Sequence, residues 1–558
     1  FFFVTQTMAG RLLQITKRVG KYVVAPTVCL GVGGYVWQQR QLSLFSEDTF
    51  DDEKPKLVVL GTGWGAMSLL SEVDTEKYNV AIVSPRNYFI FTPFLPCTTV
   101  GTIDLKHCVE SVRRVLFRFR KKAKYYEAAA SDIDFESNHV ECQDVNKADS
   151  DPTKKFRLGY EHLVIAIGAD NNTFNTKGVY EYAHFLKSLE DAKNIKRKIL
   201  KNFEQASLPS TSEEEKRKLL HFVIVGGGPT GVEFAAELHD FVNDDLSKYF
   251  NKECKKYMKI SLVEGMDHVL NAFDKEIAKY TEAKFRRNGV ELYTKTFVTG
   301  LGDGTIDFLD ARTREKTTHG TGCVVWATGI TTKPVVKKFM SKLGDHQKNA
   351  RALTVDGYLN AIGCNNVYAI GDCCTIQNNK LEGLVDNLFA NEEFSKKGLS
   401  IEDFQRFVAE HKKVYPQLDF LGDTVERVFQ KGDTNNDKRL SKAEFAELVK
   451  KADSKITSLP PTAQVAAQQG SYVAQRLNHR NDPSYKLRPF TYNHRGSFAY
   501  VGDNESVYDS DLIKLKGGAA FWGRNTAYMS KLFSWESKKD IVWDLFWSKW
   551  FGRDIAQV

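Results

Sequence analysis

Two glycine-rich turns, each placed directly after a short apolar run, constrain the fold of this chain more than any other feature. The run Lys56 to Leu60 is followed by Gly61-Thr62-Gly63-Trp64-Gly65-Ala66, and the run His221 to Val225 by Gly226-Gly227-Gly228-Pro229-Thr230-Gly231. An apolar strand, a tight glycine turn and a helix together form the phosphate-binding start of a dinucleotide-binding unit. We therefore predict an α/β protein with two Rossmann-like dinucleotide-binding domains.

Each small residue in these turns has a physical reason. The first glycine permits the sharp turn, the second lets the backbone approach a pyrophosphate, and the third small residue allows close helix-to-strand packing. These positions are Gly61, Gly63 and Ala66 in the first turn and Gly226, Gly228 and Gly231 in the second. Trp64, Gly65 and Thr230 complete the turns, where a pyrophosphate would meet a helix N-terminus.

The end of the strand that follows each turn distinguishes the two units. The strand Asn79 to Val83 ends at Ser84, so the usual acidic residue is missing and Ser84, Arg86 or backbone must hold an adenosine ribose. The strand Lys259 to Val263 ends in Glu264, whose carboxylate accepts ribose hydrogen bonds and repels a 2′-phosphate. This residue predicts that the second unit prefers NADH to NADPH.

Three further apolar runs end in small residues where backbone can pass close to a cofactor: HLVIAIGA with Gly168, CVVWATGI with Gly329, and NVYAIGDC with Gly371. The last also delivers Asp372, which we expect to hydrogen-bond a flavin ribityl chain. Strands of this kind between two nucleotide units suggest that one domain is inserted into the other, which would place nicotinamide beside isoalloxazine.

Composition excludes several other classes. With 558 residues the chain has room for two to four domains, and a net charge of +8 spread over 78 basic and 70 acidic residues is no nucleic-acid footprint. The nine cysteines form no CxxC pair, which argues against a zinc site and against a flavin-linked disulfide reductase.

The strings VVLGTGWGAMSLL, SPRNYFIFTPFLP, IVGGGPTGVEFAAEL, YAIGDC, PTAQVAAQQG and FGRD resemble the type II NADH:quinone oxidoreductases, from about Lys56 to the C-terminus. The resemblance implies FAD as cofactor, NADH as substrate, ubiquinone as acceptor, no proton pumping, and a homodimer. It also implies that Ser84 is usual at its position, that Thr92 contacts the cofactor, and that Glu233 lies near nicotinamide and flavin. From the sequence alone Glu233 could equally serve the helix dipole or packing.

In that family the segment from Pro461 to Gly470 borders the flavin and the quinone. Gln464 and Gln468 are four residues apart and share one helix face, so they are the candidates for the quinone-side wall. Without the resemblance, they could equally be surface glutamines.

The C-terminal segment has an aromatic helical face. Trp543, Phe546, Trp547 and Trp550 follow the i, i+3, i+4, i+7 pattern, and lysines lie nearby. Tryptophan favours the headgroup depth of a membrane, whereas Asp540 and Asp544 argue against a spanning helix. We expect a helix that lies on inner-membrane lipid; the alternative is a core or dimer helix.

An insertion between Asp372 and Thr462 contains a 12-residue sequence typical of an EF-hand calcium loop. Its expected ligands are Asp433, Asn435, Asp437, Arg439 at the backbone-carbonyl position, Ser441 and Glu444. Lys438 replaces the usual glycine, which predicts strain and weakened affinity. The segment Glu392 to Asp403, with Leu399 at the apolar position, aligns as a non-binding partner loop. The resemblance narrows to external, calcium-responsive members that face the intermembrane space.

The first 46 residues contain no acidic side chain, which is typical of a mitochondrial transit peptide, and the run Tyr22 to Trp37 could be a marginal anchor. The expected division of the chain is therefore a leader or anchor (1–50), a first part of the FAD domain (51–210), an NADH domain (211–345), a second FAD part (346–378), an EF-hand insertion (379–457), a third FAD part with the quinone-side helix (458–505), and a membrane-binding region (506–558).

Two rival interpretations remain open at this point. One is an enzyme related to sulfide:quinone oxidoreductase, which needs redox cysteines near the flavin and has no use for Glu264. The other is a flavin-containing protein that senses NADH and calcium and acts by interaction. A quinone-reduction assay would discriminate between these and a peripheral, calcium-modulated NADH:ubiquinone oxidoreductase of the mitochondrial inner membrane.

Overall fold

The structure is a computed structural model that describes residues 51–556, except 52, 251, 378–380, 412–414, 416–417, 419–424, 455–458 and 511. The expected leader, residues 1–50, lies outside the described residues. No helix in the described part combines the length and hydrophobicity needed to cross a bilayer.

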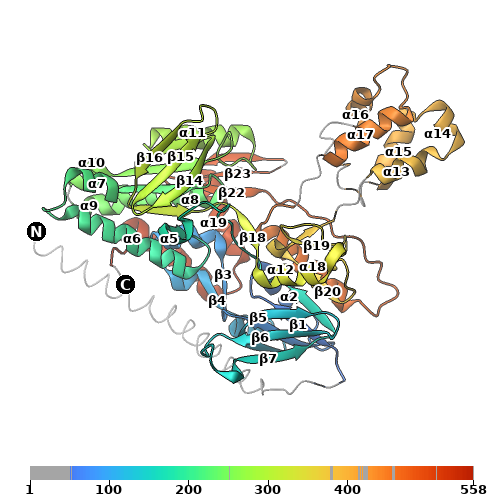
Figure 1. Ribbon diagram of the computed structural model, residues 1–558, viewed down its shortest axis with the longest axis horizontal. Coiled ribbons are helices and arrows are strands. Elements are labelled where there is room, and N and C mark those ends of the chain that lie inside the picture. Colours follow the sequence, from blue (N-terminus) through green and yellow to red (C-terminus); the bar gives the residue numbers. More distant parts are fainter. Residues whose placement is uncertain are drawn as a thin grey trace, which may run out of the picture. The chain divides into compact units, whose positions relative to one another are not determined.

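The first glycine turn belongs to a mixed sheet that, among the described residues, has the strand order β20-β8-β1-β2-β5-β6-β7 (Figure 1). Its strands are β1 (Lys56–Leu60), β2 (Asn79–Ser84), β5 (Ala123–Asp134), β6 (His139–Asp144), β7 (Lys155–Gly159), β8 (His162–Ile165) and β20 (Val367–Ala369). β1 pairs in parallel with β2 and β8, and β20 pairs with β8. The chain therefore returns to this sheet some 200 residues after β8, as an inserted second domain requires.

The second glycine turn belongs to a parallel sheet with the order β10-β17-β11-β12-β13. Its strands are β10 (Ala183–Phe185), β11 (His221–Val225), β12 (Lys259–Glu264), β13 (Glu291–Thr294) and β17 (Cys323–Trp326). The antiparallel strands β14 (Thr296–Gly302), β15 (Thr305–Asp310) and β16 (Lys316–Gly320) follow β13. The short pair β9 (Ala169–Asn171) and β18 (Ile330–Thr332) marks the two crossings between the units.

Two expected boundaries are wrong. Residues 183–207, assigned above to the FAD part, contain β10, which pairs with β17 of the second sheet, and α6 (Leu189–Ser207), which packs on that sheet. Sequence periodicity does not show which sheet a short strand will join. The boundary at residue 505 also fails, because β22 (Ser497–Gly502), β23 (Glu505–Asp509) and β24 (Lys514–Gly517) form one antiparallel sheet across it.

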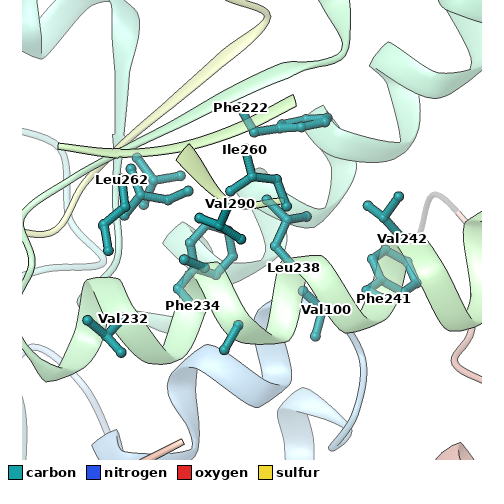
Figure 2. Close-up of a cluster of buried hydrophobic side chains, with 14 of the residues drawn as sticks. Val100, Phe222, Val232, Phe234, Leu238, Phe241, Val242, Ile260, Leu262 and Val290 are labelled. Carbon is teal, nitrogen blue, oxygen red and sulfur yellow. The ribbon is translucent and has the colours of Figure 1, made fainter. Parts of the chain in front are cut away.

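Helices α2 (Trp64–Glu72) and α8 (Pro229–Phe241) begin directly at the two glycine turns. Figure 2 shows how α8 packs: Val232, Phe234, Leu238 and Phe241 lie toward strand residues that include Phe222, Ile260 and Leu262. All of these side chains are buried. The apolar side of α8 therefore packs on the second sheet, and its other side packs on the C-terminal part of the chain.

That C-terminal part contributes α18 (Ala463–Asn478), the sheet β22-β23-β24, α19 (Gly518–Lys531) and α20 (Trp535–Phe551). α18 packs tightly on α2, since a Cβ placed on Gly470 would lie 2.2 Å from the carbonyl oxygen of Gly65. β22 and α19 pack toward α8 and its neighbours. The helix that carries Gln464 and Gln468 therefore lies against the helix of the first glycine turn.

The insertion forms a helical module with its own hydrophobic core. Its helices are α13 (Glu382–Phe389), α14 (Glu392–Lys397), α15 (Ile401–His411), α16 (Val425–Gly432) and α17 (Lys442–Ser454), drawn in orange in Figure 1. Leu399 and Leu440 form an antiparallel bridge, so the two loops pair at the expected apolar positions. The first half of the expected partner loop, however, is helix α14 rather than loop, because Asn391 caps it and Glu392 and Glu393 suit a helix N-terminus.

Candidate functional site

The first glycine turn has the geometry of a pyrophosphate cradle. Gly61 has φ +103°, and a Cβ there would lie 2.4 Å from the carbonyl oxygen of Ala166, so only glycine fits. Gly63 faces open space, with no atom within 4 Å of a built Cβ, and Ala66 is fully buried. Backbone N–H groups at a helix start with free space before them suit a dinucleotide phosphate. The turn therefore fits the pyrophosphate of a dinucleotide.

Several predicted residues gather beside this turn. The hydroxyl oxygens of Thr62 and Ser84 lie 3.0 Å apart, and the Arg86 amide donates to Ser84 Oγ at 3.3 Å. The Trp64 indole donates to Thr92 Oγ1 at 3.0 Å. Ser84, Arg86, Trp64 and Thr92 are thus brought to one edge of the first sheet, although Ser84 is buried and already bonded within the protein.

The second side of the cradle comes from the ends of β8 and β20. Gly168 has φ +67° and faces open space, and Gly371 has φ +75°. The Gly371 amide donates to Gln469 Oε1 at 2.6 Å, so α18 fixes the turn that carries Asp372. Burial raises the pKa of the Asp372 carboxyl. Its carboxyl oxygens can accept hydrogen bonds from hydroxyl groups, which suits a polyol such as a ribityl chain.

Sequence reasoning missed two residues of this cradle, Gln469 and Lys187. The Lys187 ammonium donates to the carbonyl oxygen of Ala169 at 2.7 Å, and burial lowers its pKa against the opposing charge of Asp372. The only sequence signal for Lys187 was its place before the helix cap Ser188. Gln469 stood directly after the predicted Gln468, one helix position away from the face that was singled out.

The second glycine turn repeats the geometry of the first. Gly226 has φ +114°, Gly228 faces open space, and a Cβ on Gly231 would lie 1.9 Å from the carbonyl oxygen of Gly226. Thr230 is exposed at the start of α8, and Gly329, with φ +73°, ends the neighbouring strand run. The turn thus presents an unobstructed backbone surface for a second dinucleotide.

Glu264 lies at the predicted place, at the end of β12. Its carboxylate accepts hydrogen bonds from the amides of Gly227 at 2.6 Å and Met266 at 2.8 Å. Two side chains beside it are unusually exposed for their size: Met266 at 60% and Phe297 at 52%. The Phe297 ring covers Gly265, where a Cβ would lie 2.7 Å from its edge. An acidic group and an apolar platform therefore stand together at this edge of the second sheet.

Glu233 points away from the sheet and is buried against the C-terminal part of the chain. Its Oε1 accepts from the amide of Tyr500 at 3.0 Å and from the Arg524 guanidinium at 3.2 Å. Burial raises the Glu233 pKa, and Arg524 opposes this effect. The Arg524 side chain also lies over the ring of Tyr528. No motif pointed to Arg524, which lies 291 residues from its partner.

Gln464 and Gln468 do share one face of α18, and both are half-buried. Gln464 donates to the carbonyl oxygen of Gly496 at 2.7 Å. Gln468 makes a two-way pair with the backbone of Asn493, at 2.9 Å in each direction. Neither is a free surface glutamine, because both hold the segment 493–496 against α18.

Helix α20 carries its aromatic residues on an exposed face. Trp543, Phe546, Trp547, Trp550 and Phe551 are all exposed, which excludes a place in the core of this chain. Its polar side contacts the segment 107–114: His107 Nδ1 lies 2.5 Å from Asp544, and Arg114 pairs with Glu536 at 2.6 Å. Asp544, one of the two aspartates that argue against a spanning helix, therefore attaches α20 to the segment around His107.

The EF-hand-like loop lies between α16 and α17. Asp433 Oδ2 accepts from the Lys438 amide at 2.9 Å, and Glu444 accepts from the amides of Thr434 at 2.9 Å and Ser441 at 3.0 Å. Lys438 has φ +63°, so the strain expected at this position is present. The Arg439 side chain turns away to the carbonyl oxygens of Lys397 and Gly398. Asp437 and Asn435 complete the loop through their mutual hydrogen bond at 3.0 Å.

Comparison with known proteins identifies the family. Residues 55–388 match the pyridine nucleotide-disulphide oxidoreductase family, and residues 494–554 match the NDH2 C-terminal domain. The external alternative NAD(P)H-ubiquinone oxidoreductase B1 of Solanum tuberosum is 39% identical, over 91% of each chain. The external NADH-ubiquinone oxidoreductase 2 of Saccharomyces cerevisiae is 35% identical, over 90% of this chain and 82% of its own.

Solved structures support the same family assignment. The NDH2 structure from Plasmodium falciparum in complex with NADH superposes with a TM-score of 0.80 and 33% identity, over 90% of this chain and all of that one. The sulfide:quinone oxidoreductase of Aquifex aeolicus is 13% identical with a TM-score of 0.56, which shows a shared fold alone. The resemblance seen in the sequence motifs and the predicted fold class are both confirmed, and the chain belongs to the type II NADH:ubiquinone oxidoreductase family.

Proposed function

We propose that this protein oxidises NADH with a bound FAD and passes the two electrons to ubiquinone. The observation that carries the proposal is the pair of unobstructed phosphate turns, at Gly63 and Gly228, on two different sheets of one chain. One turn suffices for a dehydrogenase with a diffusing acceptor, whereas two allow a resident flavin and a visiting nicotinamide to meet. The names of the relatives support the same activity.

The first turn and the ends of β8 and β20 would hold FAD. The open backbone at Gly63 and Gly168 would receive the cofactor, and Asp372 would bond its ribityl hydroxyls. When bound, FAD accepts the hydride of NADH and delivers electrons to a quinone. The contribution of the protein is to hold this pocket in shape through the hydrogen bond from Gly371 to Gln469.

The second turn would hold NADH. Glu264 would bond the adenosine ribose while its two backbone bonds keep the carboxylate in place. Phe297 and Met266 would cover the adenine, because an exposed aromatic and a thioether beside the ribose site offer the flat apolar contact that a purine takes. A 2′-phosphate would meet the negative charge of Glu264, so NADH is the preferred substrate.

Gln464 and Gln468 would shape the quinone side by holding the segment 493–496, and Glu233 with Arg524 would join α8 to the C-terminal helices. We assign Glu233 a position near the nicotinamide and flavin, because α8 begins at the second phosphate turn. With Oε1 bonded to Tyr500 and Arg524, only one carboxylate oxygen remains for a ligand. Glu233 is therefore expected to orient groups rather than to shuttle protons freely.

The decisive experiment is quinone reduction by purified protein. NADH with a short-chain ubiquinone should be turned over rapidly, and sulfide should not replace NADH. The sulfide:quinone alternative would need redox cysteines beside the flavin, and turnover of sulfide would favour it. NADH oxidation without quinone reduction would refute the proposal and favour a sensing protein instead.

We further propose that the helical module binds one Ca²⁺ through Asp433, Asn435, Asp437, the Arg439 carbonyl, Ser441 and Glu444. Support comes from the backbone bonds that already hold Asp433 and Glu444, the end residues of the loop. The partner loop would be structural, because half of it is helix. Comparing NADH oxidation in calcium and in chelator tests regulation, and an indifferent rate would reject it.

Finally, we propose that the exposed aromatic face of α20 lies on the inner membrane, at its intermembrane-space side, and that the enzyme acts as a homodimer. Six exposed aromatic side chains on one helix, Trp535 and the five named above, are a large apolar surface for a monomer. Replacing Trp543, Trp547 and Trp550 by serine should release the protein from zwitterionic vesicles in a sedimentation assay. Retained binding would reject this helix as the anchor.

A further inference from the structure

A cavity of about 710 Å³ lies between α6, the segment 98–105, and α20 with the tail that follows it. The ion pair of Lys196 with Asp554, at 3.7 Å, joins α6 to the tail that follows α20. The cavity belongs to neither nucleotide turn, because no residue of either turn lines it. It therefore needs a separate explanation.

One wall of the cavity is basic. Lys193, Lys196 and Arg197 follow the i, i+3, i+4 pattern on α6, so they share one face. Lys196 is engaged by Asp554. Lys193 and Arg197 form no hydrogen bond or ion pair within the part of the chain that the structure describes. Two cations thus line the cavity without an internal counter-charge.

The acidic residues of the cavity do not supply that counter-charge. Asp544 is bonded to His107 at 2.5 Å and accepts from the Asp104 amide at 3.0 Å. Asp104 pairs with Lys106 at 3.3 Å. Arg553, which also lines the cavity, pairs with Asp245 at 2.7 Å, so its charge too is balanced. The charges left open in the cavity are positive.

The opposite wall is aromatic and belongs to the proposed membrane face. Trp547 and Phe551 line the cavity, their rings are stacked at 4.2 Å, and both are exposed. Tryptophan side chains settle at the depth of lipid headgroups. The cavity accordingly opens where phosphate groups of a bilayer would be found, with an apolar wall on the side of the acyl chains.

We infer that this cavity binds the headgroup of an anionic phospholipid. Lys193 and Arg197 contact its phosphate, Arg197 through a planar fork that suits two phosphate oxygens, and Trp547 with Phe551 contact its glycerol and upper acyl chains. The inference rests on the membrane role proposed for α20. It adds a preference for anionic lipid to that role, because the positively charged headgroup of a zwitterionic lipid would lie close to the Arg197 guanidinium.

The test compares vesicles of phosphatidylcholine with vesicles of phosphatidylcholine and phosphatidylglycerol, using the full-length protein with its flavin. Wild type should bind the anionic vesicles more tightly, and Lys193→Gln/Arg197→Gln should lose about 25-fold of that affinity, at about fivefold for each cation. Lys279→Gln/Arg287→Gln removes the same charge from exposed sites on α11 (Lys275–Arg287) and should lose little. Binding of both double variants to phosphatidylcholine should equal that of wild type.

Soluble probes then separate a built site from general attraction. Dihexanoyl phosphatidylglycerol should bind wild type with measurable heat, while dihexanoyl phosphatidylcholine and inorganic phosphate should bind at least about tenfold more weakly, because each lacks part of the proposed contacts. Equal losses in both double variants, or phosphate binding as tight as the lipid, would overturn the inference. If wild type also failed on phosphatidylcholine vesicles, the membrane role of α20 would fall with it.

Discussion

The carboxylate of Glu233 and the guanidinium of Arg524 meet at 3.2 Å, with side chains only 7% and 2% exposed. The pair joins α8, which starts at the NADH-side turn, to α19 in the C-terminal part of the chain. Removing two such charges from water is costly, and the pair tolerates burial only because each partner compensates the other.

Breaking this pair should therefore cost more than replacing it. Arg524→Met leaves a buried, uncompensated Glu233 and should destabilise the protein by about 3–5 kcal/mol. Adding Glu233→Gln removes that stranded charge and should recover part of the loss. Thermal unfolding of wild type, both single variants and the double variant measures the coupling. Additive losses would mean that the two side chains do not interact energetically.

Neighbouring glutamines of α18 should have separable effects. Gln469→Leu leaves the half-buried amide of Gly371 without its acceptor, at a cost of about 1–3 kcal/mol, and should increase flavin release on dilution. Gln468→Leu frees only the segment at Asn493 and should raise KM for quinone while flavin stays bound. Flavin fluorescence in the filtrate and quinone kinetics measure the two effects. Flavin loss from the Gln468 variant alone would reverse these assignments.

Sequence reasoning located the two turns and their strands well, because glycine spacing and apolar runs are local properties. It located Glu264 for the same reason, since the acidic residue ends a strand. It could not find Arg524 or Lys187, whose partners lie far along the chain and meet them only after folding.

Helix register explains why the sequence pattern on α18 predicted Gln468 but not Gln469. Successive helix residues are separated by about 100° around the axis, so Gln468 and Gln469 serve different neighbours. The four-residue spacing of Gln464 and Gln468 correctly placed them on one face, but it could not tell which face lies toward the Gly371 turn. Packing on α2, including the contact of Gly470 with Gly65, sets that orientation.

The adenosine end of the NADH site offers a specificity test. Glu264→Gln removes the negative charge that would repel a 2′-phosphate, so the ratio of kcat/KM for NADPH to that for NADH should rise by about tenfold. Its control is Glu276→Gln, an exposed acidic residue on α11. An unchanged ratio would mean that Glu264 stabilises the turn through the Gly227 amide but does not discriminate between the two ribose groups.

Phe297 can be tested at the same end of the site. Phe297→Ala removes the proposed adenine platform and should raise KM for NADH by about five- to tenfold with little change in kcat, since adenine lies far from the reacting carbon. Tyr249→Ala, which removes a similarly exposed ring at 61%, is the matched control. A loss in kcat with constant KM would contradict the assignment.

Acid stability should depend on two buried histidines. Burial lowers the pKa of both His162 and His221 to about 4. Below a pH of about 6.5, the pKa of histidine in the unfolded chain, the unfolded chain binds protons that the folded chain does not bind. The free energy of unfolding therefore falls as the pH drops from about 6.5 to about 4, by on the order of 3 kcal/mol for each histidine. His221→Gln should flatten Tm against pH in that window, whereas the exposed His346→Gln should not. Parallel curves for wild type and His221→Gln would exclude this cause.

The calcium loop provides the sharpest test of the insertion. Asp433 is nearly buried and already bonds the amides of Asp437 and Lys438, so Asp433→Ala should abolish binding of the single expected Ca²⁺ per chain. Asp403→Asn, in the partner segment, should leave that stoichiometry unchanged, because its carboxylate caps Ser400 at the start of α15.

Lys438→Gly should then tighten binding by about fivefold, since it removes a positive charge from the loop and relieves the left-handed backbone at φ +63°. Calorimetric titration of the full-length protein with calcium measures all three variants. Weaker binding by the glycine variant would show that Lys438 supports the loop, and calcium binding that survives Asp433→Ala would place the ion elsewhere.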